Sequence, residues 1–301
     1  MNKIETLMDF CSPSARNRKI CYSIKSLSKI IKIWNLLNPL NKIIINKTDS
    51  YNDIITNLNK HFKNSYWSWI DILKLKAKTL KKPKIYNDLI EIERNDLRPA
   101  QPIEWVKNPV EWLSNYDIMK VMRQYEKIPD NYYKFLGVFS IDFGKTTKID
   151  VRKIMNSGKI KYFGFITNLS RSNEPGTHWT SSFFILDPSL PSFGGYYYDS
   201  TTGTIPNDLK PVFINIKNQV ETIFKKPFPI KINTIRHQKS NTECGVFSMA
   251  FQVLWLNYLK INKNVMLNTI VNLKEYTDEK MKKLRFTYFR PNIKDLKKTL
   301  K

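Results

Sequence analysis

The spacing of apolar residues predicts helices in the first hundred residues of the chain. Apolar side chains recur every three or four positions over 24–37, 54–62 and 66–80, and this period gives each segment one apolar face. Lys82-Pro83 is expected to break the helical pattern, and further prolines mark a boundary near residue 100. The first hundred residues therefore predict a helical domain of their own.

Beyond residue 112 the pattern changes to short apolar and aromatic runs, which are typical of buried strands. These runs lie at 133–143, 161–168, 180–186, 196–198 and 230–235. Helical patterns lie at 114–125, at 211–224 and from Cys244 onward. Strands packed between helices predict the α+β class. We expect a helical arm or accessory domain at 1–100, a core domain at 101–291 and a Lys-rich basic tail at 292–301.

Charge adds one expectation about partners. The chain has 301 residues, 42% of them apolar, and a formal net charge of +24. This apolar fraction is that of a globular protein, and the charge attracts nucleic acid and other polyanions. The lysines are dispersed and form no compact basic motif. We therefore expect nonspecific DNA contact through a basic surface, with a merely solvated, lysine-biased surface as the alternative.

The cysteines and the apolar runs indicate the compartment. Cys11, Cys21 and Cys244 show neither metal-ligand spacing nor an even disulfide framework, so we expect free structural thiols at Cys11 and Cys21 and a reducing compartment. The N-terminus lacks the apolar run of a signal peptide, and no stretch approaches the roughly 18 apolar residues of a membrane span. We expect a soluble, intracellular monomer without a membrane span, metal or organic cofactor.

Cys244 is the most informative position for chemistry, because it stands where a polar turn meets the apolar run 246–259. That run predicts a buried helix, and a thiol at a helix N-terminus is favoured in its reactive thiolate form. His178 opens a predicted strand and can act as the base, while Asp199 ends the next strand and can orient the imidazole. Gln238, six positions before Cys244, can donate with the Cys244 N–H to a developing oxyanion.

Each of these residues alone is weak evidence, because buried cysteines, strand-ending aspartates and solvated glutamines are common. Their joint occurrence in this order is stronger, since the chain has only three histidines. His237 is the rival base, but it shares the loop of the nucleophile and has no orienting acid, so we expect a structural role. Asp187 is the rival acid, expected at the far end of the strand that begins at His178. His61 is expected to be a surface or packing residue.

This ordered set resembles the SUMO/ubiquitin-like-specific and adenovirus-type cysteine proteases. The motifs that carry the resemblance are His178-Trp179, Tyr198-Asp199-Ser200, Gln238 and Glu243-Cys244-Gly245. The chain is more similar still to the African swine fever virus-type polyprotein-processing proteases of large DNA viruses. That similarity covers 112–290 and rests on Phe163-Gly164, Asn168, Thr177-His178-Trp179, the segment from Asn233 to Cys244, and the segment from Thr277-Asp278 to Arg290.

The resemblance implies a papain-related core, with a mixed central sheet flanked by helices, and an N-terminal helical arm domain. It implies cleavage after small residues, commonly at Gly-Gly-X sites, with Trp179 as a wall of the narrow cleft; a core position is the alternative for Trp179. The implied substrates are viral core or capsid polyproteins, processed during virion maturation in the viral factories of the host cytoplasm and in the virion. The swine fever virus-type enzymes carry Asn where this chain has Asp199, and either side chain can orient an imidazole.

Three other functions are open at this point. Removal of SUMO or ubiquitin from host conjugates uses the same chemistry, and the sequence does not separate it from polyprotein processing. A Ser/Thr acetyltransferase of bacterial effector type reuses a His–acid–Cys set, but such enzymes usually carry Glu as the acid, so Asp199 and His178-Trp179 argue against it. A non-catalytic basic packaging protein would have no need for an intact set of Cys244, His178, Asp199 and Gln238.

Overall fold

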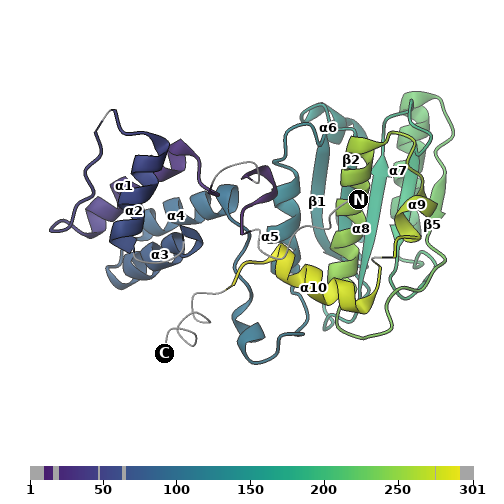
Figure 1. The fold of residues 1–301 in the computed structure, drawn as a ribbon. Helices are drawn as coiled ribbons and strands as arrows, with labels where there is room; N and C mark the ends of the chain where they lie inside the picture. The colour runs from purple at the N-terminus through teal and green to yellow at the C-terminus, as the bar shows by residue number, and fades with distance from the viewer. Residues whose placement is uncertain (1–9, 16–19, 47, 63–65, 275, 292–301) are drawn as a thin grey trace. The chain divides into compact units, whose positions relative to one another are not determined.

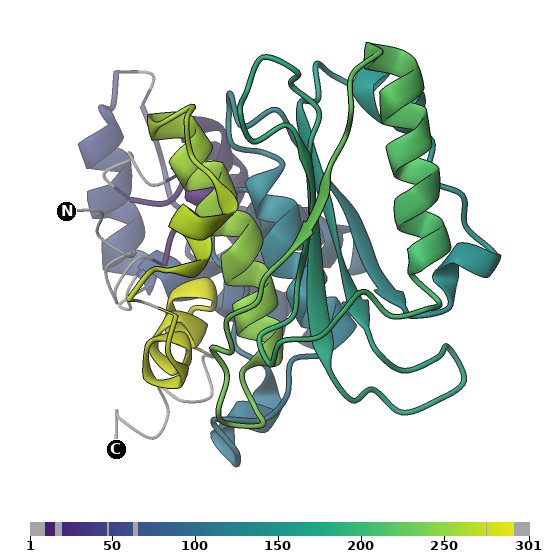
Figure 2. The same cartoon turned by 90° about the vertical axis from the view of Figure 1, so that its right-hand side faces the viewer.

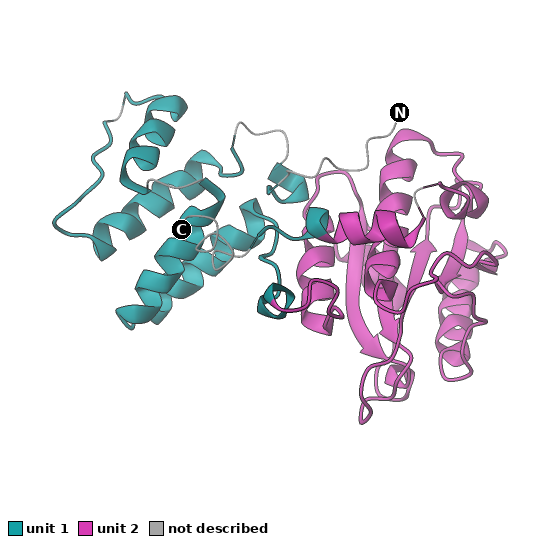
Figure 3. Cartoon of the chain, turned by 60° about the horizontal axis from the view of Figure 1, so that its bottom comes forward, with its two compact units in different colours: residues 1–106, 286–301 teal, residues 107–285 magenta. Residues whose placement is uncertain are grey.

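The structure is a computed structural model that describes residues 10–15, 20–46, 48–62, 66–274 and 276–291. The expected basic tail at 292–301 lies outside the described residues. The chain forms two compact units (Figures 1 and 3): residues 1–106 with 286–301, and residues 107–285. The division falls after Val106 rather than near residue 100, and the segment from Phe286, which we expected in the core domain, groups with the first unit.

The first unit is helical. Its helices are α1 (Ile24–Leu37), α2 (Tyr51–Phe62), α3 (Trp69–Thr79) and α4 (Pro83–Asp96), with short 3-10 helices η1 (Pro13–Ala15), η2 (Tyr66–Ser68) and η3 (Ile103–Val106). The first three helices match the predicted segments. The expected break at Lys82-Pro83 separates α3 from α4, but the helix that begins there was not predicted, and Pro83 occupies its first turn. A helix makes no intrahelical bond from the N–H groups of that turn, so proline starts a helix without loss.

Cys11 and Cys21 form a disulfide in the first unit, so the expectation of free thiols is wrong. An antiparallel bridge sets Cys11 beside Leu97, and Cys21 is buried just before α1 begins. The two Cα atoms lie 4.8 Å apart, within the range that a disulfide spans. Their separation along the chain does not report this distance, which is why the cysteine count misled the prediction.

A buried ion pair attaches the C-terminal segment to the first unit. The Arg290 guanidinium bonds both Asp71 of α3, with Nη2 2.9 Å from Oδ1, and Glu93 of α4. Arg290 is fully buried, so it must be paired to remain charged there. Ala100 and Arg290 also form a parallel β-bridge. These partners lie far apart in the sequence, so local patterns could not place the segment from Phe286.

The second unit is built on a five-stranded sheet in the order β1-β2-β3-β4-β5. The strands are β1 (Tyr133–Ser140), β2 (Tyr162–Asn168), β3 (Trp179–Ile185), β4 (Gly194–Tyr198) and β5 (Ile230–Ile232). The outer pairs β1–β2 and β4–β5 are parallel, and β3 is antiparallel to both neighbours. The sheet is therefore mixed, and the expected α+β class is confirmed.

Helices cover both faces of this sheet (Figure 2). The helices from residue 107 onward are α5 (Asn115–Tyr125), α6 (Val151–Asn156), α7 (Lys210–Phe224), α8 (Cys244–Ile261), α9 (Leu267–Val271) and α10 (Asp278–Tyr288), with a 3-10 helix η4 (Phe143–Lys145). Successive residues of β3 point to opposite faces. Phe183 stacks on Trp255 of α8 with ring centroids 5.9 Å apart, and Phe184 packs on Phe213 of α7 at 5.3 Å. Helices α6, α9 and α10 were not predicted from the apolar pattern.

Helix α8 is the central helix of this unit. Its length and mean hydropathy of 1.2 would suit a membrane span, but 72% of it is buried inside the described part of the chain. Ser248 Oγ donates to the Trp179 carbonyl, and Gln252 Nε2 donates to the Phe165 carbonyl, each at 3.0 Å. These bonds fix α8 against the middle strands, and so they fix its first residue, Cys244, relative to the edge where β3 begins.

Candidate active site

The structure brings His178, Asp199 and Cys244 together at one edge of the sheet. His178 directly precedes β3 and Asp199 directly follows β4, and Ser181 pairs with Tyr198 between these antiparallel strands. The start of β3 and the end of β4 therefore meet, and His178 Nε2 lies 2.8 Å from Asp199 Oδ1. Cys244 is the first residue of α8, and its thiol is close enough to His178 to help raise the pKa of the imidazole. Since Nε2 faces Asp199, Nδ1 is the nitrogen left for the sulfur.

Two residues hold Asp199 in place. Thr201 donates twice to Asp199 Oδ1, from its N–H and from Oγ1, each at 2.8 Å. Asn233 Oδ1 accepts from the Asp199 N–H and Asn233 Nδ2 donates to the Asp199 carbonyl, each at 2.9 Å. Sequence reasoning had assigned no function to Thr201 or Asn233. The position of Thr201, two residues after a candidate acid, is the signal that could have suggested it.

These contacts set the charges of the site. Burial lowers the pKa of His178, but hydrogen bonds with Asp199 and Cys244 outweigh it and raise the pKa to about 9. Burial raises the pKa of Asp199, but bonds from His178 and Thr201 outweigh it and hold the pKa below its ordinary value. His178 is thus favoured as imidazolium at neutral pH, and a cation beside a thiol favours the thiolate.

Gln238 is buried near the nucleophile, with its amide held by two neighbours. Its Oε1 accepts from Ser200 Oγ at 2.6 Å, and its Nε2 donates to the Ser240 carbonyl at 2.8 Å. The amide nitrogen carries two hydrogens, so one donor remains after the bond to Ser240. Gln238 lies on the loop that leads to Cys244, and the Cys244 N–H, in the first turn of α8, has no intrahelical acceptor.

Trp179 packs against the start of α8. Its Nε1 donates to the Leu113 carbonyl at 3.0 Å, and only 8% of the residue is exposed. A Cβ at Gly245 would lie 3.3 Å from atoms of both Leu113 and Trp179, tighter than most such contacts. The residue after the nucleophile must therefore be small for the indole to reach its place. Trp179 is both a packing residue and a wall of the adjoining pocket.

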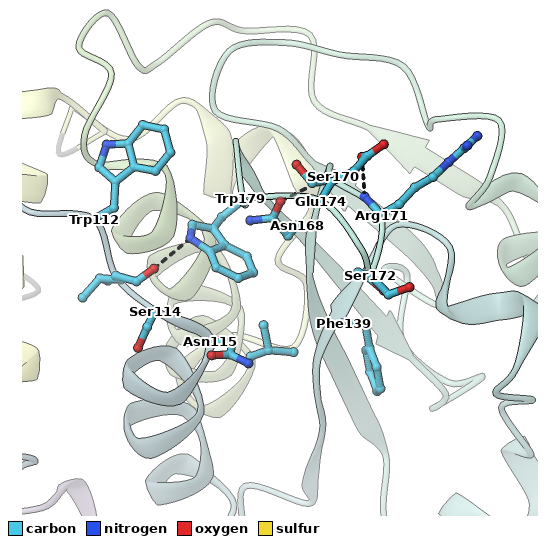
Figure 4. A pocket seen from close by; sticks show the side chains of 14 residues that line it. Trp112, Ser114, Asn115, Phe139, Asn168, Ser170, Arg171, Ser172, Glu174 and Trp179 are labelled. Carbon is cyan, nitrogen blue, oxygen red and sulfur yellow. Dashed lines mark hydrogen bonds between the residues drawn. The ribbon is translucent and has the colours of Figure 1, made fainter.

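That pocket lies beside Trp179 and has a volume of about 440 Å³ (Figure 4). Its lining comes from the start of α5, from β1 and from the loop between β2 and β3: Trp112, Leu113, Ser114, Asn115, Val138, Phe139, Ser140, Asn168, Ser170, Arg171, Ser172, Glu174, Gly176 and Trp179. Figure 4 shows Trp112 and Trp179 on one side, with the β2–β3 loop opposite. Apolar walls with a few polar groups are typical of a site that binds an organic ligand or peptide.

Asn168, at the end of β2, presents an oriented amide in this pocket. Its Oδ1 accepts from the N–H groups of Ser170, at 3.0 Å, and Thr177, at 3.1 Å. The Nδ2 group must therefore point the other way, where a Cβ at Gly176 would approach it to 2.9 Å. Among the described residues, no acceptor bonds this nitrogen, and so it is available to a carbonyl of a bound peptide.

The rival residues are excluded from this site. His237 is buried between the Tyr198 hydroxyl and the Val271 carbonyl, which confirms its structural role. Asp187 lies beyond the opposite end of β3 and pairs with Lys161 at 2.9 Å. His61 packs edge-on against an indole of the first unit, as expected of a packing residue. Within the described ranges, no three His, Cys, Asp or Glu side chains gather as metal ligands.

Comparisons with known proteins show similarity to viral proteases. No family model matches the chain. A thiol protease of Acanthamoeba polyphaga mimivirus is 26% identical over 275 residues, which cover 83% of this chain and 85% of the relative. The cysteine protease of African swine fever virus is 24% identical over 200 residues, which cover 61% of this chain and 70% of the viral enzyme. The chain is thus similar to viral cysteine proteases along most of its length.

The solved structures agree with the fold of the protease. The crystal structure of the African swine fever virus protease has a TM-score of 0.60 to this chain, at 20% identity, and covers 94% of this chain and 96% of its own. In other isolates the swine fever virus enzyme is named a SUMO-1 cysteine protease, 25% identical over 202 residues that cover 61% of this chain and 70% of the relative. The suspected resemblance to SUMO-protease-like viral enzymes is thus confirmed.

Proposed function

We propose that the protease is an endopeptidase with a Cys244–His178–Asp199 triad that cleaves after small residues. One observation carries the proposal: His178 bonds Asp199 through Nε2 and lies beside Cys244, the first residue of a buried helix, which leaves Nδ1 for the sulfur. This arrangement supplies a thiolate, a proton donor and a group that orients the donor. No metal or organic cofactor is needed for these steps.

The cycle follows from these positions. The Cys244 thiolate attacks the scissile carbonyl carbon, and the carbonyl electron pair moves onto the oxygen. The Cys244 N–H and the second N–H of Gln238 Nε2 stabilise that oxyanion. The His178 imidazolium gives its proton to the amine as the C–N bond breaks, leaving a thioester. Neutral His178 then takes a proton from water, whose oxygen attacks the thioester and releases the acid and the thiolate.

Specificity for small residues comes from the walls next to the nucleophile. Trp179 and Leu113 close on Gly245, so little room is left for side chains of the substrate beside Cys244. Glycine suits such a narrow passage because a peptide backbone without a Cβ can approach closely. The pocket beyond Trp179 is wider, and the Asn168 amide can bind a main-chain carbonyl there. Together these features support Gly-Gly-X sites.

The expected role in virus maturation remains part of this proposal. The related proteases belong to large DNA viruses, which supports viral core or capsid polyproteins as substrates. Action in the viral factories of the host cytoplasm and in the virion is proposed on the same basis. The name SUMO-1 cysteine protease for one relative favours a second candidate, removal of ubiquitin-like modifiers from host conjugates.

The experiment that tests the proposal offers both kinds of substrate to the full chain. A panel of Gly-Gly-X peptides is compared with fluorogenic SUMO and ubiquitin conjugates, and Cys244→Ala is the control. Cleavage of peptides alone supports polyprotein processing, and dominant cleavage of conjugates supports modifier removal. If neither substrate is cleaved, or if Cys244→Ala cleaves as fast as the wild type, the proposed mechanism is wrong.

The charge of +24 adds a proposal about DNA. A nonspecific basic surface concentrates the protease on DNA and raises its encounter rate with substrates that are packaged there. We expect added duplex DNA to increase peptide cleavage at low salt and to lose this effect as salt rises. Turnover that is the same with and without DNA at low salt would contradict this expectation.

A further inference from the structure

Arg285 of α10 is a buried cation whose side chain reaches the loop that carries the nucleophile. Its Nε and Nη2 each lie 3.1 Å from Glu243 Oε2, and Nη2 also lies 3.1 Å from the Thr242 carbonyl oxygen. Its Nη1 donates to the Glu111 carbonyl. The side chains of Arg285 and Glu243 are 1% and 0% exposed, so the pair is sealed from water.

The partners of Arg285 stand directly before two parts of the active site. Thr242-Glu243 immediately precede Cys244, the first residue of α8. Glu111 immediately precedes Trp112-Leu113, which line the pocket. One planar guanidinium with five N–H donors therefore connects the nucleophile loop to the pocket wall by hydrogen bonds. A lysine ammonium in its place is a point charge without this fixed planar set of donors.

The charge of the pair matters as much as its geometry. Glu243 is an anion one residue before the nucleophile, and an unpaired anion there would oppose formation of a thiolate. Arg285 balances that charge at hydrogen-bond distance. Other charged groups also hold this region: His178 with Asp199 from the sheet, Arg236, whose Nε donates to the Gln238 carbonyl, and Asp278 of α10, whose carboxylate accepts from two backbone N–H groups of the loop.

We propose that Arg285 is a positioning residue for Cys244: it fixes the nucleophile loop against the pocket wall and cancels the charge of Glu243 beside the sulfur. The inference rests on the proposed thiol chemistry. A residue that only stabilised the fold would change the melting temperature. A residue that acts through Glu243 on Cys244 also changes how thiol reactivity depends on pH.

The test is the rate of Cys244 alkylation by iodoacetamide across a pH series, under non-reducing conditions. Cys244 is the free cysteine of the chain, because the other two form a disulfide, so the rate reports on it alone. Arg285→Gln leaves Glu243 unbalanced, and the pH of half-maximal rate should rise, by on the order of one unit. Glu243→Gln leaves Arg285 unbalanced, and that pH should fall by a similar amount. The double variant should return close to the wild type.

Turnover of a Gly-Gly-X peptide is measured beside alkylation. Arg285→Lys keeps the positive charge but loses the planar set of guanidinium N–H donors. We therefore expect the wild-type alkylation profile, with kcat at least about tenfold lower and KM little changed. The matched controls are Lys283→Gln and Glu279→Gln, which neutralise an exposed ion pair on the same helix, 56% and 75% exposed. Both should match the wild type in alkylation and turnover.

The outcomes separate this inference from the proposed function. If Arg285→Gln and Glu243→Gln leave the alkylation profile of the wild type, Arg285 only packs, and the inference is overturned. If Arg285→Gln does not fold, Glu243→Gln and Arg285→Lys carry the same test. Opposite shifts in a protein that cleaves neither peptide nor conjugate would support the positioning role and contradict the proposed peptidase.

Discussion

Two histidines near strand β4 have pKa values that move in opposite directions. His178 bonds the Asp199 carboxylate and the Cys244 thiol, and although burial opposes its charge, its pKa rises to about 9. His237 lies between the Tyr198 hydroxyl at 2.9 Å and a backbone carbonyl at 2.8 Å. Burial lowers the pKa of His237, and the carbonyl offsets this only in part.

The difference teaches that the partner decides the protonation state of a buried histidine. His178 faces ionisable groups that gain from its charge, whereas His237 faces neutral groups and three stacked rings, those of Tyr198, Phe247 and Tyr276. Desolvation of an imidazolium is offset by an anion and only in part by a neutral dipole. One histidine is therefore suited to proton transfer, and the other to holding the loop before Gln238.

The largest expected effect breaks the reactive side of this comparison. His178→Ala removes both the proton donor and the partner of the thiolate, and we expect kcat to fall by about four orders of magnitude or more, close to the effect of Cys244→Ala. Initial rates on a Gly-Gly-X peptide measure this loss. The melting temperature should fall by only a few degrees, and a variant that keeps a tenth of the activity would show that His178 is not the base.

A smaller loss is expected for Asp199→Asn. The two Thr201 donors hold an oxygen at the position of Oδ1, so the new amide should still accept from His178 and keep its tautomer. Only the negative charge is lost, and we expect about a tenfold fall in kcat. NMR titration should show a lower pKa of His178 in this variant. An unchanged pKa would mean that Asp199 does not set the charge of the site.

The structural side of the comparison is tested by His237→Phe. The ring shape is kept, but the Tyr198 hydroxyl and the Val271 carbonyl lose their partner, and we expect a loss of about 1–3 kcal/mol in unfolding free energy. The pKa of His237 lies below its unfolded value of 6.5, so its contribution is present above pH 6.5 and is lost as pH falls. Urea unfolding at several pH values should show weaker acid sensitivity in the variant. If the variant and the wild type lost stability equally at acid pH, groups other than His237 would cause that loss.

The smallest expected effect is a loss of fold stability at alkaline pH, when His178 loses its proton. The pKa of His178 is raised in the folded protein from 6.5 to about 9, so its charge stabilises the fold fully below pH 6.5 and ceases to do so as pH rises through about 9. The melting temperatures of the wild type and His178→Ala should therefore converge by a few degrees over that range. A difference that stays constant would contradict the raised pKa.

The sequence was sufficient wherever a pattern is local. The three- and four-residue period of α1 to α3, the strand runs β1 to β5 and the apolar helix after Cys244 were predicted close to their observed bounds. The order of His178, Asp199 and Cys244 was sufficient to nominate the site, because each stands at the end of a predicted element. Antiparallel pairing of β3 with β4 then brings two of those ends together.

Other features depend on contacts that no local pattern encodes. The helix that begins at Pro83 was missed because proline signals a break in a helix and a start equally well. The Cys11–Cys21 disulfide and the attachment of Arg290 to Asp71 join segments whose proximity arises only after folding. Thr201 was missed because a threonine in a turn is common, and its two bonds to Asp199 appear only in three dimensions.

By itself the sequence determined which residues of the protease have the chemistry of a thiol peptidase, since thiol, imidazole and carboxylate are properties of single side chains. Only the tertiary structure decided what charge each of them carries. The protonation of His178 and His237 depends on neighbours supplied by other strands and helices. The balance of the Glu243 charge depends likewise on Arg285, which reaches the loop before Cys244 from a different helix. Electrostatic energy is set by distance and burial, and folding alone sets both.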